Sequence, residues 1–338
     1  MDRVFDQLSE SHVFSASATV SKDLPRDRVI TEILLHGKMV YDTDSSVTEA
    51  EDALVRMMGG LQIVGSRGQT FADIADLRLL YYLAHQLKAG ALRTDAFDDT
   101  VSQSDVTKYV AIPLHFGVNW ADRFDPSAGI PAEFGMSELK AKMVYPANSV
   151  GGTGVTTDAT TAVYMAVAGL QGGAQQHVRM KPKITQSDYS PTATYSNLGY
   201  KANLPTGAFL RYSLIMNLNS SGDRNDTNVT EIALEVPKLQ AAKPFKLDWQ
   251  VAKSAFGRAP VQGGNTPTAG GGIFPAGIIL IDWKDLIDPS KAGMIDPRAF
   301  TYGLDLRSVE DGDLRLAFTV GTSGGTIKIL HVQYEPMN

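Results

Sequence analysis

The segment that decides the fold reads Asn119-Trp120-Ala121-Asp122-Arg123-Phe124-Asp125-Pro126-Ser127-Ala128-Gly129, and a second version reads Asp282-Trp283-Lys284-Asp285-Leu286-Ile287-Asp288-Pro289-Ser290-Lys291-Ala292-Gly293. Trp120 matches Trp283 at an offset of 283 − 120 = 163 residues, and Asp122 and the Asp125-Pro126-Ser127 triplet repeat at the same offset. An internal repeat of this kind indicates an architecture built from two similar units.

The match extends towards the N-terminus, where Leu24-Pro25 corresponds to Leu204-Pro205 at an offset of 204 − 24 = 180 residues. Four strand-like apolar runs accompany the two matches, at residues 29–41, 110–116, 208–218 and 276–281. Because the offset falls from 180 to 163 along the chain, the first copy has the longer internal loops. The sequence therefore predicts two related halves of unequal length.

The composition is typical of a folded chain with about two domains. The 338 residues are 43% hydrophobic and 20% charged, which supports substantial cores. The absence of cysteine excludes disulfides, thiolate catalysis and cysteine-based zinc sites. The net charge of −6 provides no overall basic surface, so we expect no sequence-specific nucleic-acid partner.

The N-terminal residues do not read as a signal peptide, because they are acidic and mixed and lack an apolar core. No apolar run approaches the roughly 20 residues that cross a bilayer. Residues 1–12 are predicted to form a short amphipathic helical arm, with Val4, Phe5, Leu8 and His12 on one side. We expect this arm to dock on its own domain or on a neighbouring subunit, with contact to a membrane as the alternative.

Two further helices are predicted at matching places in the two halves, over 71–87 and 245–256, with Gly90 and Gly257 as their stop signals. Residues 52–66 read as a strand with a bulge at Gly59-Gly60. The other predicted strands lie near residues 13–21, 27–42, 105–118, 136–146, 160–169, 176–187, 208–218, 228–236, 273–282, 302–309, 313–321 and 325–335.

Many short strands separated by glycine and proline are typical of a β-sandwich or barrel. Glycine-rich loops are expected at 151–154 and 263–272, and the seam between the halves near 187–191. The expected domains are an arm of residues 1–12, a first unit of residues 13–188 and a second unit of residues 189–338.

The sequence predicts no catalytic, cofactor-binding or metal-binding residues. The six histidines form no ligand pair, and His36, His115 and His331 lie in apolar strands, which favours satisfied structural histidines over metal ligands or catalytic bases. The glycine-rich loops lack the Lys-Ser/Thr ending of a phosphate cradle, and no Gly-x-Ser-x-Gly nucleophile elbow is present.

The repeated aspartates could suggest paired acid and base groups. Asp122, Asp125, Asp285 and Asp288 lie in turn-like segments, where aspartate caps backbone N–H groups, and the repetition favours a structural role. Trp120 and Trp283 are interpreted as anchors beneath these loops rather than as sugar-stacking platforms.

Residues 24–87 combine a long strand, the segment Leu54-Val55-Arg56, the polar turn Gly65-Ser66-Arg67-Gly68 and a helix opening near Ala72-Asp73-Ile74-Ala75-Asp76-Leu77. With the repeat, this layout resembles the double jelly-roll major capsid proteins of tailless icosahedral bacteriophages, of the corticovirus, finnlakevirus or tectivirus type. The resemblance implies an all-β fold with two consecutive eight-stranded jelly-roll β-sandwiches, each with a short helix.

The resemblance also implies a structural function without enzyme activity. The chain would form homotrimers that serve as pseudo-hexameric capsomers of an icosahedral shell. Its partners would be neighbouring capsomers, minor capsid or penton proteins and an internal viral membrane, contacted through residues 1–12. The protein would be made in the host cytoplasm and reside in the virion, with the insertions at 119–135, 147–159 and 257–272 making tower or inter-capsomer contacts.

Two alternative functions belong to other classes of protein. A carbohydrate-binding or receptor-binding β-sandwich, such as a spike, would need an exposed aromatic cluster in a loop. A β-sandwich hydrolase would need carboxylates that converge from different strands, and the sequence shows no such set.

Overall fold

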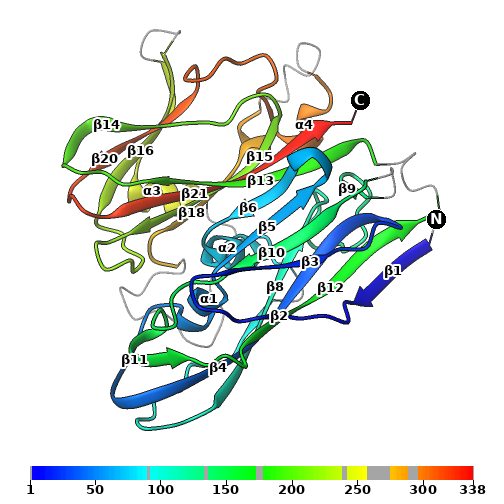
Figure 1. The fold of residues 1–338 in the computed structure, drawn as a ribbon. Helices are drawn as coiled ribbons and strands as arrows, with labels where there is room; N and C mark the ends of the chain where they lie inside the picture. The colour runs from blue at the N-terminus through cyan, green and yellow to red at the C-terminus, as the bar shows by residue number, and fades with distance from the viewer. Residues whose placement is uncertain are drawn as a thin grey trace. The chain divides into compact units, whose positions relative to one another are not determined.

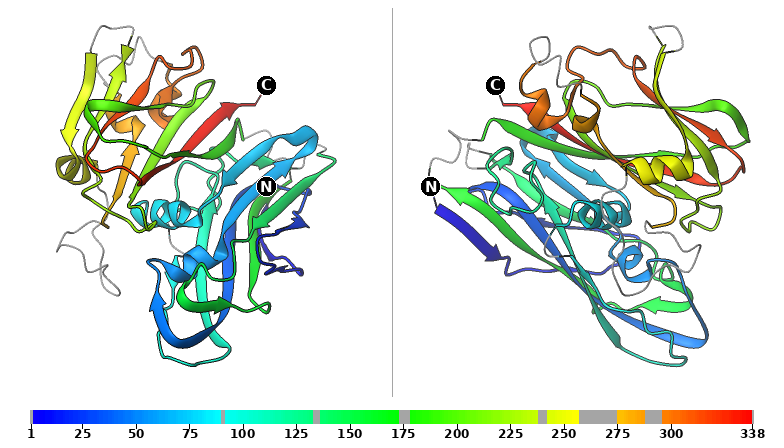
Figure 2. Two further views of the ribbon diagram at one scale, coloured as in Figure 1. Left: turned by 60° about the vertical axis from the view of Figure 1, so that its left-hand side comes forward. Right: turned by 180° about the vertical axis from the view of Figure 1, so that it is seen from behind.

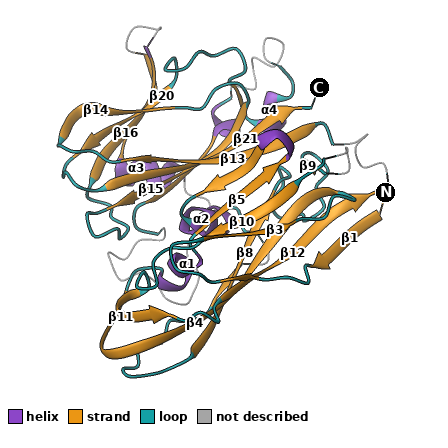
Figure 3. Ribbon diagram, viewed as in Figure 1, coloured by secondary structure: helices purple, strands orange, loops and turns teal. Residues whose placement is uncertain are grey.

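The computed structural model describes residues 2–89, 92–132, 136–172, 178–237, 242–256, 275–287 and 296–337 (Figure 1). The chain divides into two compact units, Met1–Thr185 with Pro336–Asn338 and Gln186–Glu335. This division lies three residues before the boundary expected between residues 188 and 189. Strands make up most of the regular structure in both units (Figure 3).

The first unit has two sheets. One sheet has the strand order β1 (Asp2–Gln7), β12 (Ala162–Gln171), β4 (Val29–Glu49), β8 (Val106–His115) and β7 (Arg93–Thr94). The short strands β2 (His12–Val13), β9 (Ile130–Pro131) and β11 (Gly152–Thr157) pair with it. The other sheet has the order β3 (Thr19–Asp23), β10 (Leu139–Val144), β5 (Gly60–Gly65) and β6 (Thr70–Ile74). Strand β6 also pairs in parallel with Ile184 and Thr185 of β13 (Met180–Tyr189).

The second unit repeats both strand orders. Strands β21 (Thr326–Pro336), β15 (Phe209–Leu218) and β18 (Ile278–Asp282) correspond to β12, β4 and β8. Strands β14 (Tyr195–Asn203), β20 (Arg315–Val320), β16 (Val229–Val236) and β17 (Ala242–Asp248) correspond to β3, β10, β5 and β6. The repeat predicted from the tryptophan segments is therefore a repeat of sheet topology. The pairs β4–β8 and β15–β18 are both antiparallel.

The core of the first unit follows from alternation along its long strands. Side chains on one face of β4, such as Ile33, Leu35 and Met39, are fully buried, because successive side chains of a strand point to opposite faces. Strands β4 and β8 run side by side for ten residue pairs, from Glu32↔His115 to Tyr41↔Val106 (Figure 2). Helix α1 (Ala53–Met58) packs on both strands, and helix α2 (Leu77–Gln86) packs on β8.

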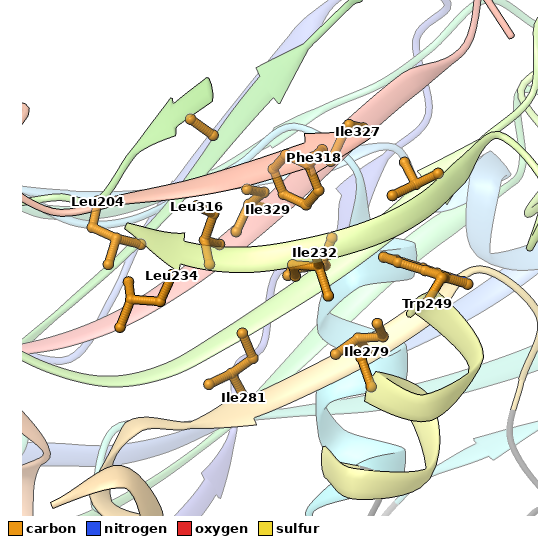
Figure 4. Packing of buried hydrophobic residues seen from close by; sticks show 14 of the residues in the cluster. Leu204, Ile232, Leu234, Trp249, Ile279, Ile281, Leu316, Phe318, Ile327 and Ile329 are labelled. Carbon is orange, nitrogen blue, oxygen red and sulfur yellow. The ribbon is translucent and has the colours of Figure 1, made fainter. Parts of the chain in front are cut away.

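The core of the second unit is one large apolar cluster (Figure 4). Trp249 at the start of α3 (Trp249–Phe256) and Trp283 at the start of the 3-10 helix η4 (Trp283–Leu286) are fully buried in it. Ile232 and Phe318 come from the paired strands β16 and β20. The remaining short elements are η1 (Ser66–Gly68), α4 (Ala299–Tyr302) and β19 (Leu304–Asp305).

The predicted N-terminal helix is wrong. Residues 2–7 form β1, which pairs antiparallel with β12 from Asp2↔Gln171 to Gln7↔Ala166. A helix of so few residues is marginal by itself, whereas an edge strand gains ladder hydrogen bonds along its length. Pairing with β12, and not the helical spacing of Val4, Phe5 and Leu8, therefore determines the structure of this segment.

Three helix and strand boundaries also differ from the predictions. Residues 53–58 form α1 rather than a strand, and the chain turns into β5 at Gly59, which has φ 75°. A side chain at Gly59 would collide with the carbonyl oxygen of Val144, so glycine is required there. Residues 70–74 and 242–248 form strands β6 and β17, so only the later parts of the two predicted helices are helical.

Helix α2 begins where a capping residue allows it. The Asp76 carboxylate accepts a hydrogen bond from the backbone N–H of Arg78 (3.1 Å) and also binds its guanidinium. Such a cap satisfies donors that the first turn leaves free.

Two further predictions of loops and strands differ from the structure. Residues 152–154 of the expected loop 151–154 belong to strand β11, and only residues 304–305 of the predicted strand 302–309 form a strand, β19. Gly90, Gly257 and the loop 263–272 lie outside the described residues.

Candidate functional site

The aspartates of the first tryptophan segment hold a turn. Asp125 accepts hydrogen bonds from the backbone N–H of Asn119 (2.6 Å) and from the backbone N–H and hydroxyl of Ser127 (2.9 and 2.8 Å). Asp122 accepts one from the backbone N–H of Phe124 (3.0 Å). These contacts confirm the prediction that the two carboxylates cap backbone groups.

The same loop covers a buried acidic residue. Glu32 on β4 lies opposite His115 on β8, and its side chain is fully buried. Arg123 Nε lies 3.3 Å from Glu32 Oε2, and His115 Nε2 lies 3.8 Å from Glu32 Oε1. Neither oxygen of Glu32 nor either ring nitrogen of His115 has a hydrogen-bond partner in the part of the chain that the structure describes.

Burial sets the protonation states of this pair. Loss of water raises the pKa of Glu32 to about 7, although the Arg123 guanidinium opposes the shift. Burial lowers the pKa of His115 to about 4. Both side chains are therefore uncharged between about pH 4 and pH 7. Since neither side chain reaches solvent, the pair offers no acid or base to a dissolved substrate.

The second unit has a polar cluster at the place that corresponds to Glu32 and His115. It lies where β15 pairs with the end of β18, directly before the second tryptophan segment. Arg211 and Asp282 form a buried ion pair of 3.0 Å. The Trp283 indole N–H donates to the Ser213 hydroxyl (2.8 Å), which lies 2.9 Å from His331 Nδ1. Burial lowers the pKa of His331 to about 3, so the imidazole that forms a hydrogen bond with Ser213 is neutral.

The second pair of repeated aspartates is only partly described. Asp285 lies in η4, and Asp288 lies outside the described residues. Asp282, which precedes the tryptophan, caps η4 by accepting from the backbone N–H of Lys284 (3.1 Å). Asp282 therefore supplies a cap that the alignment did not predict.

The two tryptophans are anchors, as predicted. Trp120 is 2% exposed and Trp283 is fully buried, so neither presents a face to a sugar. Tyr189, Tyr195 and Tyr200 form an aromatic group in the second unit, but they are partly buried against its core. The loop-borne aromatic cluster that a sugar-binding sandwich would need is not made by either tryptophan.

The three strand histidines differ in their surroundings. His331 is buried and hydrogen-bonded, His115 is buried without a hydrogen bond among the described residues, and His36 is exposed and stacks on Tyr109 at 5.7 Å. The prediction of a satisfied structural histidine is therefore confirmed for His331 and wrong for His115, while the His36 side chain is exposed. This side chain occupies an outward position of β4, which alternation alone does not assign to core or solvent.

The described residues contain no group of three or more His, Asp or Glu side chains placed to hold a metal ion. In the same part of the chain, no helix is long and apolar enough to cross a membrane.

Two side chains of the N-terminal strand β1 contact the rest of the first unit. Asp6 forms an ion pair of 2.6 Å with Arg28, and the Arg123 guanidinium lies 5.0 Å from the centroid of the Phe5 ring.

No family model matches the chain, and no curated protein sequence matches it. Several solved structures, however, have a similar fold. The major capsid protein (MCP) of STIV, the Sulfolobus turreted icosahedral virus, is similar with a TM-score of 0.75 over 99% of this chain and 97% of its own, at 12% identity. This similarity extends over both units and includes the repeated sheets. The chain is a double jelly roll.

Two other double jelly rolls are similar along their whole length. The PBCV-1 virus capsid model matches with a TM-score of 0.61 over 98% of this chain and 94% of that chain, at 12% identity. The major capsid protein P2 from bacteriophage PM2 matches with a TM-score of 0.54 over 100% and 98%, also at 12% identity. The fold implied by the sequence resemblance is confirmed, and the two units are its first and second rolls.

Sequence reasoning missed Glu32 and the outward face on which it lies. The available signal was a single acidic residue inside the run Val29-Ile30-Thr31-Glu32-Ile33-Leu34-Leu35. A charged residue is rarely buried without a partner, so an acid in such a run indicates a polar contact from elsewhere in the chain. Which segment makes that contact depends on the path of the 117–129 loop.

Proposed function

We propose that this chain is a structural subunit of an icosahedral virus shell and works through contacts between copies rather than through catalysis. The observation that supports this function is the double jelly roll itself, which spans nearly all of the chain. The solved structures that share it are capsid proteins of STIV, PBCV-1 and PM2. Sheets closed into sandwiches leave the loops and outward faces free for lattice contacts.

The proposed assembly unit is a homotrimer, in which six rolls form a pseudo-hexagonal capsomer. Its further partners would be neighbouring capsomers and minor capsid or penton proteins, and its location would be the virion shell after synthesis in the host cytoplasm. A tailless bacteriophage is the narrower proposal. The similarity to P2 of PM2 supports it, but the higher TM-score of the STIV protein shows that the fold does not distinguish hosts.

Contact with an internal membrane would involve β1 rather than a helix. This strand exposes one large apolar side chain, Phe5, at 43%. An amphipathic helix would place a whole stripe of apolar side chains in a bilayer, whereas one phenylalanine on an edge strand anchors weakly. The proposed membrane contact through residues 1–12 is therefore a peripheral one.

Light scattering of the purified chain, followed by negative-stain imaging, tests the proposal. Three chains of 36.4 kDa give about 109 kDa, and the particles should have a hexagonal outline. A monodisperse 36.4 kDa monomer that never assembles would overturn the proposal. That result would favour the sugar-binding or receptor-binding sandwich, which glycan-array binding would then test.

A further inference from the structure

The N-terminal strand β1 lies at the end of its sheet (Figure 1). In the part of the chain that the structure describes, it pairs with β12 alone, so its ladder hydrogen bonds lie on one side. None of its six side chains is buried. Since β1 gains little from packing, its side-chain contacts with neighbouring segments decide how firmly it is held.

Two of these contacts join β1 to the 117–129 loop. The Arg123 guanidinium of the loop lies 5.0 Å from the ring centroid of Phe5 on β1. In the reverse direction, the Arg3 guanidinium of β1 lies 5.3 Å from the ring centroid of Phe124 in the loop. A guanidinium within about 6 Å of an aromatic centroid is attracted electrostatically by the ring. If the loop moves away, β1 therefore loses both contacts at once.

Arg123 also contacts the buried acid beneath the loop. The register places Phe5 opposite Ala168 on β12, and Ala168 opposite Glu32 on β4. His115 on β8 completes this row, whose members point to the same side of the sheet. Arg123 spans the small side chain of Ala168, because its Nε lies 3.3 Å from Glu32 Oε2 while its guanidinium reaches Phe5. One side chain thus links the buried acid to the terminal strand.

Few ionisable groups surround Glu32. They come from β8, the loop, β1 and the same side of β4 itself, and they are His115, Arg123, Asp122, Asp125, Arg3 and His36. Strand β12 contributes the uncharged Ala168. Burial lowers the pKa of His115 to about 4, so this neighbour stays neutral from pH 5 to pH 8.

The closed loop keeps water away from Glu32. Its side chain is fully buried, and neither of its oxygens has a hydrogen-bond partner among the described residues. An ionised carboxylate is costly in such a place and well solvated in water. Loss of water accordingly raises the pKa of Glu32 to about 7. The Arg123 side chain above it is 40% exposed, so movement of the loop would bring water to the acid.

We propose that Glu32 and the 117–129 loop form a pH-sensitive switch that holds β1 at acid pH and releases it as the pH rises. The inference concerns a single chain, so it does not depend on the shell function. The pKa of Glu32 is about 7 under the closed loop and 4.5 in water. The closed state is therefore favoured most below pH 4.5, and this advantage is lost as pH rises to 7. The open fraction should rise at least about tenfold between pH 5 and pH 8.

Hydrogen exchange of the wild-type chain, corrected for the intrinsic pH dependence of amide exchange, tests the switch. At the two ends of the loop, the backbone N–H groups of Val118 and Gly129 donate to Ser127 Oγ (2.9 Å) and to the Met180 carbonyl (3.2 Å). The peptides 117–129 and 2–8 should both exchange at least about tenfold faster at pH 8 than at pH 5. Strand β16 of the second unit serves as the internal reference and should show no such change.

Glu32→Gln is the matched variant, because it keeps the shape of the protonated acid and cannot ionise. It should remove the pH response from both peptides. Since the variant leaves the other ionisable groups in place, its difference from the wild type isolates Glu32. Circular dichroism at pH 5 checks that the variant is folded.

The outcomes separate clearly. A parallel rise in the loop and in β1, absent from Glu32→Gln, supports the switch. The same rise in both proteins overturns it, and so does a rise in the loop that β1 does not follow. If the variant fails to fold, the wild-type curve decides: the rise should level off by about pH 8, and a rise that continues unchanged to about pH 9 contradicts a group of this pKa.

Discussion

The two rolls bury polar groups at corresponding places in different ways. In the first roll, Glu32 and His115 are buried without hydrogen bonds among the described residues. In the second, Asp282 pairs with Arg211, and Trp283, Ser213 and His331 form a hydrogen-bonded chain. A repeat of topology therefore does not repeat the chemistry beside its tryptophans. The first cluster favours uncharged side chains, whereas the second depends on a retained ion pair.

The largest expected effect comes from breaking the ion pair of the second roll. Asp282→Asn keeps the side-chain shape but leaves Arg211 buried without its counter-charge, which should cost about 3–5 kcal/mol. Urea unfolding followed by circular dichroism measures the change. At pH 5, Glu32→Gln should be nearly neutral, since glutamine resembles the protonated acid already present. Equal losses in the two variants would contradict the comparison.

The pH dependence of Glu32→Gln sharpens the difference. The folded-state pKa of Glu32 is raised from 4.5 to about 7, so its stabilising contribution is complete below pH 4.5 and is lost as pH rises to 7. The variant should therefore gain stability relative to the wild type across this window, by at most about 3 kcal/mol at pH 8. His115 contributes the opposite slope to both proteins, so the difference isolates Glu32.

Stability curves at pH 4.5, 6 and 8 check this prediction. The control is Val144→Glu, which adds a carboxylate at a position that is 37% exposed and should show no comparable pH window. A constant difference between Glu32→Gln and the wild type would show that folding does not raise the pKa of Glu32, so that Glu32 is ionised in the folded chain at pH 6 and 8. In that case the two clusters would be more alike than we infer.

The tryptophans should differ by a smaller amount. Trp283→Phe removes the donor to Ser213, whereas the Trp120 indole nitrogen has no hydrogen-bond partner among the described residues. Both substitutions remove a similar volume, so Trp283→Phe should cost about 1–2 kcal/mol more than Trp120→Phe. Thermal or urea unfolding of the two variants measures this difference, and an equal cost would show that the hydrogen bond contributes little.

The smallest expected effect is in the first tryptophan loop. Asp125→Ala removes three hydrogen bonds that hold the turn and should cost about 1 kcal/mol, whereas Asp122→Ala removes one and should cost less. Urea unfolding again provides the measurement. A larger loss for Asp122→Ala would contradict the assignment of Asp125 as the main cap.

Much of the strand pattern was predictable because long runs of β-forming residues leave few alternatives. The strands at 106–115, 209–218 and 229–236 lie where alternation and apolar character place them. The errors include β14, a nine-residue strand that was not predicted, and several shorter segments. Residues 2–7 and 53–58 are too short for propensity to decide, and pairing with β12 or the turn at Gly59 decided them instead.

The sequence alone determined the duplication, the turn role of Asp125 and the anchoring role of the tryptophans, because each depends on local chemistry that neighbouring residues complete. Only the tertiary structure decided that Glu32 lies under Arg123 and that His36, on the same side of β4, is exposed. Alternation assigns side chains to two faces of a strand but does not say which face the rest of the molecule covers. That choice depends on contacts between residues about 70 to 130 positions apart, and the sequence pattern does not specify which residues of such distant strands pair.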